Sequence, residues 1–385
     1  MSDEPWVRTP DEVARLAETL SRTRALALDS ESDSLHHHRE KVCLIQLADD
    51  AGRTFLVDPL AVRDLSALAP VIADPQVRKV LHGADYDVTT LKRDFGFAFA
   101  GIFDTMIAAR FIGLPAVGLQ AVAQAELGIA LSKDSQKDDW SRRPLTPTQE
   151  HYAREDVRHL LVLQARLQAK LQEQGRLAWV QEECDAVATL EPARRRHDAD
   201  AWQKMKGVRQ LPARAREIAR RIHAWRETVA DATDVPAFKI LNTDTIFAMA
   251  KAPPRAETDL RAYRGIYPRY REHAPALVET IAQALASSER SWAPLSSSPK
   301  PPPVPPATKA RIDALRAWRT LEGARLALDI SLVLPQRLLE RVAEAAPRTL
   351  EDLAQVDGLR RWRVEALGAS MLAALPRTLP FDAGR

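Results

Sequence analysis

Three strand-like runs follow one another closely near the start of the chain, and their order limits the possible folds more than any other feature. The runs are residues 25–31, 42–47 and 54–57, with a turn sequence at 49–52 between the last two. From about residue 65, helical patterns alternate with short strand patterns such as residues 79–82. Strands followed by interleaved helices predict an α/β fold with a mixed sheet for this part of the chain.

The first of these runs ends in two carboxylates. Asp29 and Glu31 are two residues apart, so in a strand their side chains point to the same face. Two like charges held this close resist joint ionisation unless a cation lies between them, which favours a metal site. The alternative is a surface strand end that runs into a polar loop. This stretch by itself does not decide between the two.

A second acidic stretch, residues 82–88, leads from a strand into a helix. Asp85 stands where a helix N-cap is expected, and capping is its favoured role. Asp87 lies in the first turn, where it can complement the helix dipole, but it also stands at a strand-to-helix junction like that of the first pair. Asp104, which precedes a further helix, is interpreted chiefly as a cap.

The third stretch lies in a helix whose start is clear from the sequence. Residues 146–149 form a capping box with Pro at the first helical position, and the helix is expected to continue to about Gln174. Tyr152 and Asp156 are four residues apart in it, which places a phenol and a carboxylate on one face. Such a pair is common on helix surfaces. Only its combination with the other two acidic stretches indicates a site.

Residues 131–144 form a polar segment of mixed charge that contains one tryptophan. For Trp140 we expect packing into the core rather than stacking on a base. The basic side chains of this segment can contact the phosphates of a nucleic acid, and they are Lys133, Lys137, Arg142 and Arg143. Residues 36–38 are three consecutive histidines. Because three such side chains cannot all face one ion in a regular element, a solvated loop is expected there.

Composition and the two cysteines exclude several classes of protein. Cys43 and Cys184 form neither a Cys-x-x-Cys pair nor a Cys/His ligand spacing, which argues against a disulfide framework and a structural zinc site and fits a reducing compartment. No apolar stretch reaches membrane-spanning length, and the N-terminus lacks a signal-peptide pattern. We therefore expect a cytoplasmic protein without membrane contact. With a net charge of only +3, nucleic-acid affinity must come from local patches.

The three acidic stretches together resemble the three motifs of the DEDDy 3′→5′ exonucleases, and most closely the ribonuclease D family. The resemblance covers about the first 170 residues and rests on residues 29–31, on Asp87 after residues 82–84, and on residues 152–156. Residues 41–47 and 139–145 support it. Ser30 stands where this family usually has Thr, which leaves both neighbouring carboxylates in place.

This resemblance implies a ribonuclease H-like exonuclease domain over residues 1–175. It implies that Asp29, Glu31, Asp87 and Asp156 are metal ligands and that Tyr152 helps to position the attacking water. Two Mg²⁺ or Mn²⁺ ions about 3.5–4 Å apart can activate a water and stabilise the departing 3′-oxygen. The expected products are nucleoside 5′-monophosphates released from the 3′ end.

The second half of the chain has helical patterns and few strand signals. Two of its stretches resemble HRDC domains, the small helical module of RecQ-type helicases and ribonuclease D, and the second is the more divergent. The expected segments are a helical connector (176–200), a first HRDC domain (201–290), a Pro/Ser-rich linker (291–307) and a second HRDC-like domain (308–378). We therefore expect one α/β domain followed by two all-α domains.

A run of basic residues surrounds the start of the first HRDC-like stretch. If these residues bind phosphates, the HRDC domain holds nucleic acid beside the exonuclease cleft, as the resemblance implies. The alternative is that they are ordinary surface residues of helices. The residues are Arg194, Arg195, Arg196, Lys204, Lys206, Arg209, Arg214, Arg216, Arg220 and Arg221.

The preferred function is that of a metal-dependent 3′→5′ exoribonuclease which trims tRNA precursors or other structured RNA with a free 3′ end. One alternative is a DNA 3′→5′ exonuclease in repair, since the same motifs and the HRDC module occur there. Another is a catalytically silent nucleic-acid-binding protein, although the presence of all four carboxylates and the tyrosine argues against it. No obligate protein partner is inferred.

Overall fold

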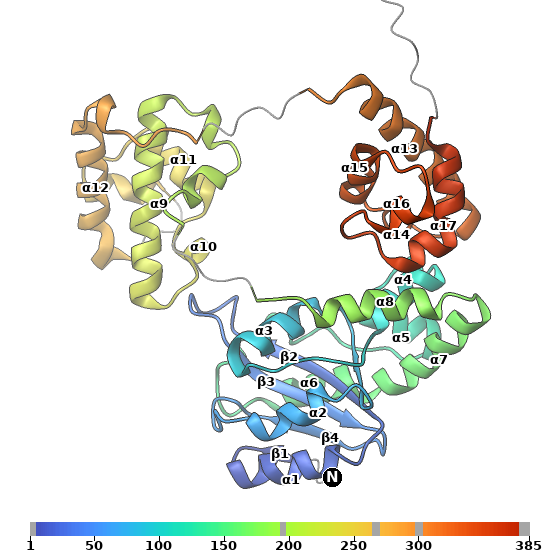
Figure 1. Cartoon of the computed structure of the whole chain (residues 1–385). Coiled ribbons are helices and arrows are strands. Elements are labelled where there is room, and N and C mark those ends of the chain that lie inside the picture. Colours follow the sequence, from blue (N-terminus) through green and yellow to red (C-terminus); the bar gives the residue numbers. More distant parts are fainter. Residues whose placement is uncertain (1–4, 193–197, 264–269, 297–302, 377–385) are drawn as a thin grey trace, which may run out of the picture. The chain divides into compact units, whose positions relative to one another are not determined.

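The computed structural model describes residues 5–192, 198–263, 270–296 and 303–376 (Figure 1). The chain divides into two compact units. The first comprises Met1–Glu31, Val42–Ala193 and Pro302–Arg385, and the second comprises Ser32–Lys41 and Arg194–Pro301. Some predicted features lie outside the described residues, namely Arg194, Arg195 and Arg196, part of the linker 291–307, and the last residues of the segment 308–378.

The first unit is built on a six-stranded mixed sheet with the order β1-β4-β3-β2-β5-β6, which confirms the predicted sheet. Strand β3 is antiparallel to β4, whereas β2, β5 and β6 pair in parallel. Because the carboxyl ends of parallel strands lie at the same edge of a sheet, the end of β2 meets the ends of β5 and β6 there. The strands are β1 (Trp6–Val7), β2 (Ala25–Ser32), β3 (Val42–Asp49), β4 (Thr54–Val57), β5 (Arg78–Leu81) and β6 (Ile102–Asp104).

Helices pack on this sheet to complete the α/β part of the first unit, defined here as residues 5–31 and 42–192. They are α1 (Pro10–Leu20), the 3₁₀ turn η1 (Ser66–Leu68), α2 (Ala69–Ala73), α3 (Asp85–Phe95), α4 (Thr105–Ile112), α5 (Leu119–Leu127), α6 (Pro147–Arg158), α7 (Leu160–Glu173) and α8 (Leu177–Ala188). Capping boxes at Thr9 and Thr146 start α1 and α6. All eight residues of β3 are buried, which fits its largely apolar sequence; the exceptions are the buried polar residues Gln46 and Asp49.

One predicted helix differs from the observed structure. The single helix expected from residue 147 to about 174 is interrupted at His159, which separates α6 from α7. The interruption lets the two segments take different partners: α6 packs against β3 and β4, and α7 packs against α4 and β5. The periodicity of the sequence does not show this change of direction, because α6 and α7 both have helical patterns and only one residue separates them.

The C-terminal helical part (residues 303–376) belongs to the same unit and shares an apolar cluster with the α/β part. Figure 1 shows its helices beside α4 and α8. The indole of Trp362 stacks on that of Trp179 with ring centroids 4.8 Å apart and meets the edge of Phe111 at 5.5 Å. The helices are α13 (Pro306–Leu326), α14 (Ile330–Val333), α15 (Gln336–Ala345), α16 (Leu350–Ala354) and α17 (Arg361–Ala374).

Charged groups from α8 complete this contact. The Glu182 carboxylate accepts hydrogen bonds from the backbone N–H groups of Arg361 at 2.7 Å and Trp362 at 2.8 Å, and so satisfies the start of α17. The Glu183 carboxylate accepts hydrogen bonds from the Arg363 guanidinium at 2.6 Å and from the indole N–H of Trp362 at 2.9 Å. The described residues after the linker are therefore packed onto the α/β part.

The second unit has an apolar core of its own around Trp202, Ile218, Ile222, Met249 and Leu277. Its described residues from 198 onward form helices and no strand, as expected for an all-α domain. They are η2 (Ala201–Lys204), η3 (Val208–Gln210), α9 (Ala213–Thr233), α10 (Ala237–Ile240), α11 (Thr243–Lys251), η4 (Glu257–Ala262), η5 (Arg271–His273), α12 (Ala274–Ala286) and η6 (Glu289–Ser291). None of the helices in the described parts of the chain is both long and apolar enough to cross a membrane.

Candidate active site

The structure brings three of the predicted acids together at the end of β2. Single carboxylate oxygens of Asp29, Glu31 and Asp156 all lie within 4.8 Å of one another. Asp29 and Glu31 come from β2, and Asp156 comes from the second half of α6. Among the residues that the structure describes, no other group of three His, Cys, Asp or Glu side chains is this compact.

Asp87 lies beside this cluster rather than within it. It is in the first turn of α3, its side chain is buried, and its Oδ1 accepts a hydrogen bond from the Ser30 hydroxyl at 2.5 Å. Burial, followed by the negative charge of Asp29, raises the pKa of the Asp87 carboxyl well above its usual range. Asp87 and Asp29 are therefore close enough to repel each other when both are charged.

Tyr152 lies one turn before Asp156 on the same face of α6. Burial raises the pKa of the phenol, and the charges of Asp156, Glu31 and Asp29 raise it further. The hydroxyl therefore keeps its proton and acts as a hydrogen-bond donor at the site. The Tyr152 ring lies 6.0 Å from that of Trp140, measured between centroids.

The pKa values show that the carboxylates of the acidic cluster are unfavourable in their charged form when no cation is bound. Burial raises the pKa of Asp29 to about 6. Burial and the charge of Asp29 raise the pKa of Asp156 to about 8, and burial with its acidic neighbours raises the pKa of Glu31 well above the usual range. Because the donors are carboxylate oxygens alone, the residues fit a hard divalent cation such as Mg²⁺ or Mn²⁺.

Without metal, the folded protein is expected to lose stability as the pH rises from about 5 to 8.5. Asp29 and Asp156 have folded-state pKa values of about 6 and 8, above the 3.8 of the free side chain. The folded state therefore binds more protons between these values. Their stabilising protonation is complete below about pH 4 and is lost as the pH rises through the folded-state values.

Thermal unfolding in EDTA across this pH range measures the effect. A variant with both Asp29→Asn and Asp156→Asn is the control, because it lacks two of the titrating groups, and its melting temperature should depend less on pH. If the melting temperature changes with pH equally in the variant and the wild-type protein, the raised pKa values of Asp29 and Asp156 are contradicted. Added Mg²⁺ should raise the wild-type melting temperature most at the alkaline end.

Asp104 holds the turn that leads into α3. Its buried carboxylate accepts hydrogen bonds from the N–H groups of Gly83 at 3.0 Å and Ala84 at 2.8 Å, and it also caps α4. The expected cap role of Asp104 is thus observed, and a second role is added. The prediction that Asp85 caps α3 is wrong, because Ala84 occupies the N-cap position and Asp85 is the first helical residue.

The structure shows the surroundings of two side chains of the segment 131–144, Trp140 and Arg143. Trp140 is 1% exposed, which confirms packing in the core. Arg143 is partly buried and bonded within the protein: its guanidinium donates to both Asp58 oxygens, at 2.7 and 2.9 Å, and to the carbonyl oxygen of Cys43 at 2.6 Å. These internal contacts use donors that a phosphate would need.

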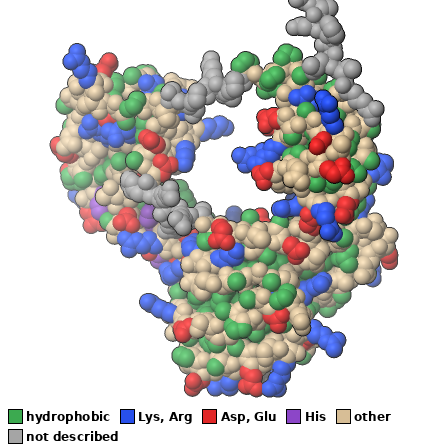
Figure 2. Space-filling model, in the orientation of Figure 1, with side chains coloured by type: hydrophobic (Ala, Val, Ile, Leu, Met, Phe, Trp, Pro, Cys, Tyr) green, Lys and Arg blue, Asp and Glu red, His purple; other side chains and the backbone are tan. Residues whose placement is uncertain are grey.

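The other basic residues named from the sequence are exposed. Lys133, Lys137 and Arg142 lie on the α/β part, and Arg142 pairs with Asp139 at 3.1 Å. Lys204, Lys206 and Arg209 lie on the second unit, with Lys204 paired to Asp198 at 2.7 Å and Arg209 donating to the Ser296 carbonyl at 3.2 Å. Figure 2 shows Lys and Arg side chains at several places on the visible face, interspersed with Asp and Glu.

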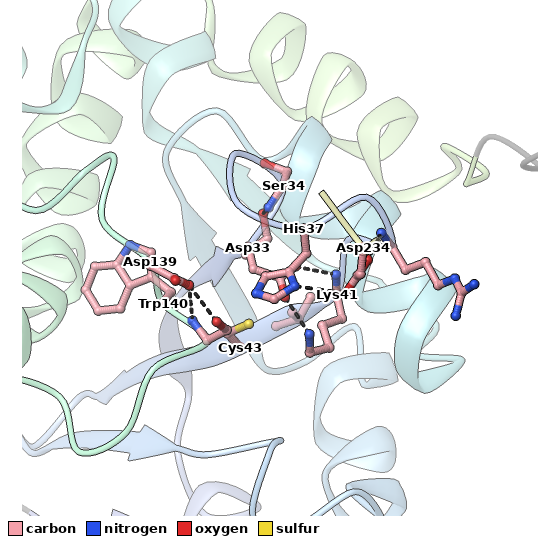
Figure 3. Close-up of polar contacts among 12 residues, drawn as sticks. Asp33, Ser34, His37, Lys41, Cys43, Asp139, Trp140 and Asp234 are labelled. Carbon is pink, nitrogen blue, oxygen red and sulfur yellow. Dashed lines mark hydrogen bonds and ion pairs between the residues drawn. The ribbon is translucent and has the colours of Figure 1, made fainter. Parts of the chain in front are cut away.

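The three histidines at 36–38 lie in a loop of the second unit, as predicted, but they are partly buried rather than fully solvated. Figure 3 shows His37 facing Asp234, with Nδ1 2.9 Å from Oδ2, and Lys41 beside Asp33. The backbone N–H of Arg39 also donates to Asp234, at 2.8 Å. A contact between residues so far apart in the sequence leaves no local pattern.

Sequence reasoning missed two further contributors to the site. Ser30 was considered only for its difference from Thr, although its hydroxyl contacts Asp87. Asp138 adds negative charge near Glu31 and helps to raise its pKa. Ser30 could have been found by its place between two acids, whereas nothing in the sequence distinguishes Asp138 from the neighbouring acids Asp134 and Asp139.

Comparison with known families supports the same description. A family model of the 3′–5′ exonuclease domain matches residues 5–172, and the HRDC domain model matches residues 215–281 and 308–375. The fold and the acidic site thus define a 3′→5′ exonuclease that carries HRDC domains.

Relatives of similar length narrow the class. Ribonuclease D of Pseudomonas paraeruginosa is 32% identical over 96% of this chain and 97% of its own length. Ribonuclease D of Zymomonas mobilis is 27% identical over 99% of this chain and 96% of its own length. The chain belongs to the ribonuclease D family of 3′→5′ exoribonucleases.

Solved structures agree with this fold. The catalytic core of RRP6 from Trypanosoma brucei is 26% identical, with a TM-score of 0.68 over 74% of this chain and 80% of that one. Escherichia coli RNase D is 24% identical, with a TM-score of 0.66 over 96% of this chain and 98% of that one. The predicted fold class, an α/β exonuclease domain followed by helical HRDC-type domains, is confirmed.

Proposed function

We propose that this exoribonuclease removes nucleoside 5′-monophosphates one at a time from the 3′ end of RNA, with two divalent cations held by its acidic site. The observation that carries the proposal is the convergence of Asp29, Glu31 and Asp156 within 4.8 Å, with Asp87 next to Asp29. Carboxylates placed this way are costly to keep charged, and a bound cation removes that cost.

The proposed ligand roles follow from this arrangement. Asp29, Glu31 and Asp156 would hold one cation, and Asp29 with Asp87 would hold the second, each Mg²⁺ or Mn²⁺. When bound, such ions activate a water and stabilise the charge that develops on the departing 3′-oxygen. Tyr152, which lies one turn before Asp156 on α6, would donate from its hydroxyl to the attacking water or the scissile phosphate and so orient it.

For the substrate, we propose tRNA precursors or other structured RNA with a free 3′ end, in the cytoplasm. Escherichia coli RNase D is described as an exoribonuclease involved in structured RNA processing, and this chain has the same fold over nearly its full length. We propose exposed basic residues as phosphate contacts and omit Arg143, because Asp58 and backbone carbonyls occupy its guanidinium. The proposed contacts are Lys133, Lys137, Arg142, Lys204, Lys206 and Arg209.

Digestion of 5′-labelled oligonucleotides tests this function. With Mg²⁺ or Mn²⁺, an RNA with an unpaired 3′ end is expected to shorten stepwise from that end, and EDTA should stop the reaction. A DNA of the same sequence is the control for sugar selectivity, because a pocket that requires the 2′-hydroxyl rejects it. Equal shortening of both would favour the DNA exonuclease alternative, and RNA binding without shortening would favour a silent binding protein.

A further inference from the structure

The residue between the two acids of β2 has a role of its own. Successive side chains of a strand point to opposite faces, so Ser30 points away from Asp29 and Glu31. The burial pattern agrees, because Asp29 and Glu31 are partly exposed while Ser30 between them is buried. Ser30 therefore does not take part in the cluster of three carboxylates.

Its hydroxyl instead reaches the fourth acid. Oγ of Ser30 donates to Oδ1 of Asp87 at 2.5 Å, and Ser30 and Asp87 are only 9% and 5% exposed. A hydrogen bond to a charged acceptor is stronger than one between neutral groups, and water has little access to replace a buried donor. With Oδ1 held, the carboxylate cannot rotate freely, so the direction of its second oxygen is set.

The backbone beneath Asp87 is fixed separately. The Asp104 carboxylate accepts the N–H groups of Gly83 and Ala84 at the entry to α3, which sets where this helix begins. Asp104 thus fixes the helix, and Ser30 fixes the side chain that the helix carries.

We propose that Ser30 is a positioning residue which holds Asp87 so that, together with Asp29, it completes the second cation position. This inference rests on the proposed function, because it assumes two bound ions. In this inference the Ser30 hydroxyl supports only the second cation position. The position formed by Asp29, Glu31 and Asp156 does not depend on it.

The direct test is Mn²⁺ binding to RNA-free protein, measured by isothermal titration calorimetry. The wild-type protein is expected to bind two ions, and Ser30→Ala should bind one as before and the other about tenfold more weakly. Ser30→Thr keeps the hydroxyl and should restore binding. Thr23→Val is the matched control, since it also removes a buried hydroxyl, one that donates to the Leu20 carbonyl away from the acids.

Kinetics supply a second readout. In Ser30→Ala, kcat at limiting Mg²⁺ should fall about tenfold while KM for RNA stays unchanged, and a higher Mg²⁺ concentration should recover much of the loss. Two ions bound equally well by Ser30→Ala and the wild-type protein would overturn the role of Ser30 and leave the proposed function standing. If the wild-type protein binds only one ion, the second cation position and the role of Ser30 are both overturned. If the wild-type protein binds no ion, the proposed function is overturned as well.

Discussion

Replacing Asp156 by asparagine is expected to stop RNA hydrolysis and, without metal, to stabilise the protein at pH 8. Burial and the charge of Asp29 raise the pKa of the Asp156 carboxyl to about 8, so the site disfavours its charge. Asparagine is similar in size and is uncharged. We expect the free energy of unfolding to rise by about 2 kcal/mol and the rate of hydrolysis to fall about 10³-fold or more.

Urea unfolding in EDTA and the oligonucleotide assay measure the two effects on the same preparations. Glu155→Gln is the matched control: it lies next to Asp156 on α6 but pairs with Arg158 at 2.8 Å and His159 at 3.2 Å. It should keep most of the activity and gain no stability. An Asp156→Asn protein that still degrades RNA at a rate near that of the wild-type protein would rule out Asp156 as a ligand.

Removing the Glu183 carboxylate is expected to lower the free energy of unfolding of the first unit strongly. Glu183 accepts hydrogen bonds from Arg363, which is 4% exposed, and from the indole of Trp362. Glu183→Ala would leave the Arg363 charge buried without its carboxylate partner. Such a loss costs about 3–5 kcal/mol in other proteins, and about 3 kcal/mol is expected here.

Chemical denaturation followed by tryptophan fluorescence suits this measurement, because Trp179 and Trp362 stack at the same contact. Asp185→Asn is the control on the same helix. Its side chain is exposed, and the change should alter stability by less than about 0.5 kcal/mol. A double-mutant cycle with Arg363→Met should show coupling between the two positions. A loss below about 1 kcal/mol for Glu183→Ala would contradict a tightly held pair.

This contact also affects how the C-terminal helical part should be studied. Deletion of residues 303–376 would expose Trp179 and Phe111, which now pack against Trp362. A shortened chain would therefore lose stability as well as any RNA contact made by this part. Substitutions of exposed residues on α13 or α15 separate the two effects better than truncation does.

Much of the α/β part follows from patterns that are local in the sequence. Capping boxes at Thr9 and Thr146 mark helix starts because the cap hydroxyl and the third helical residue bond within one turn. The buried strand β3 is visible as a largely apolar run. The acids Asp29, Glu31 and Asp156 were identified from their spacing within single elements and their resemblance to family motifs, and they do converge.

What the sequence by itself determined is the order of the elements, the type of fold and the identity of the acidic residues, since each depends on contacts within a few residues. Only the tertiary structure decided which distant residues the side chains contact. Ser30 binds Asp87, 57 positions away, and Arg143 binds Asp58, 85 positions away. Trp362 packs on Trp179 across the linker. These pairings depend on how separate elements pack, and a side chain's local sequence does not state which distant group it will meet.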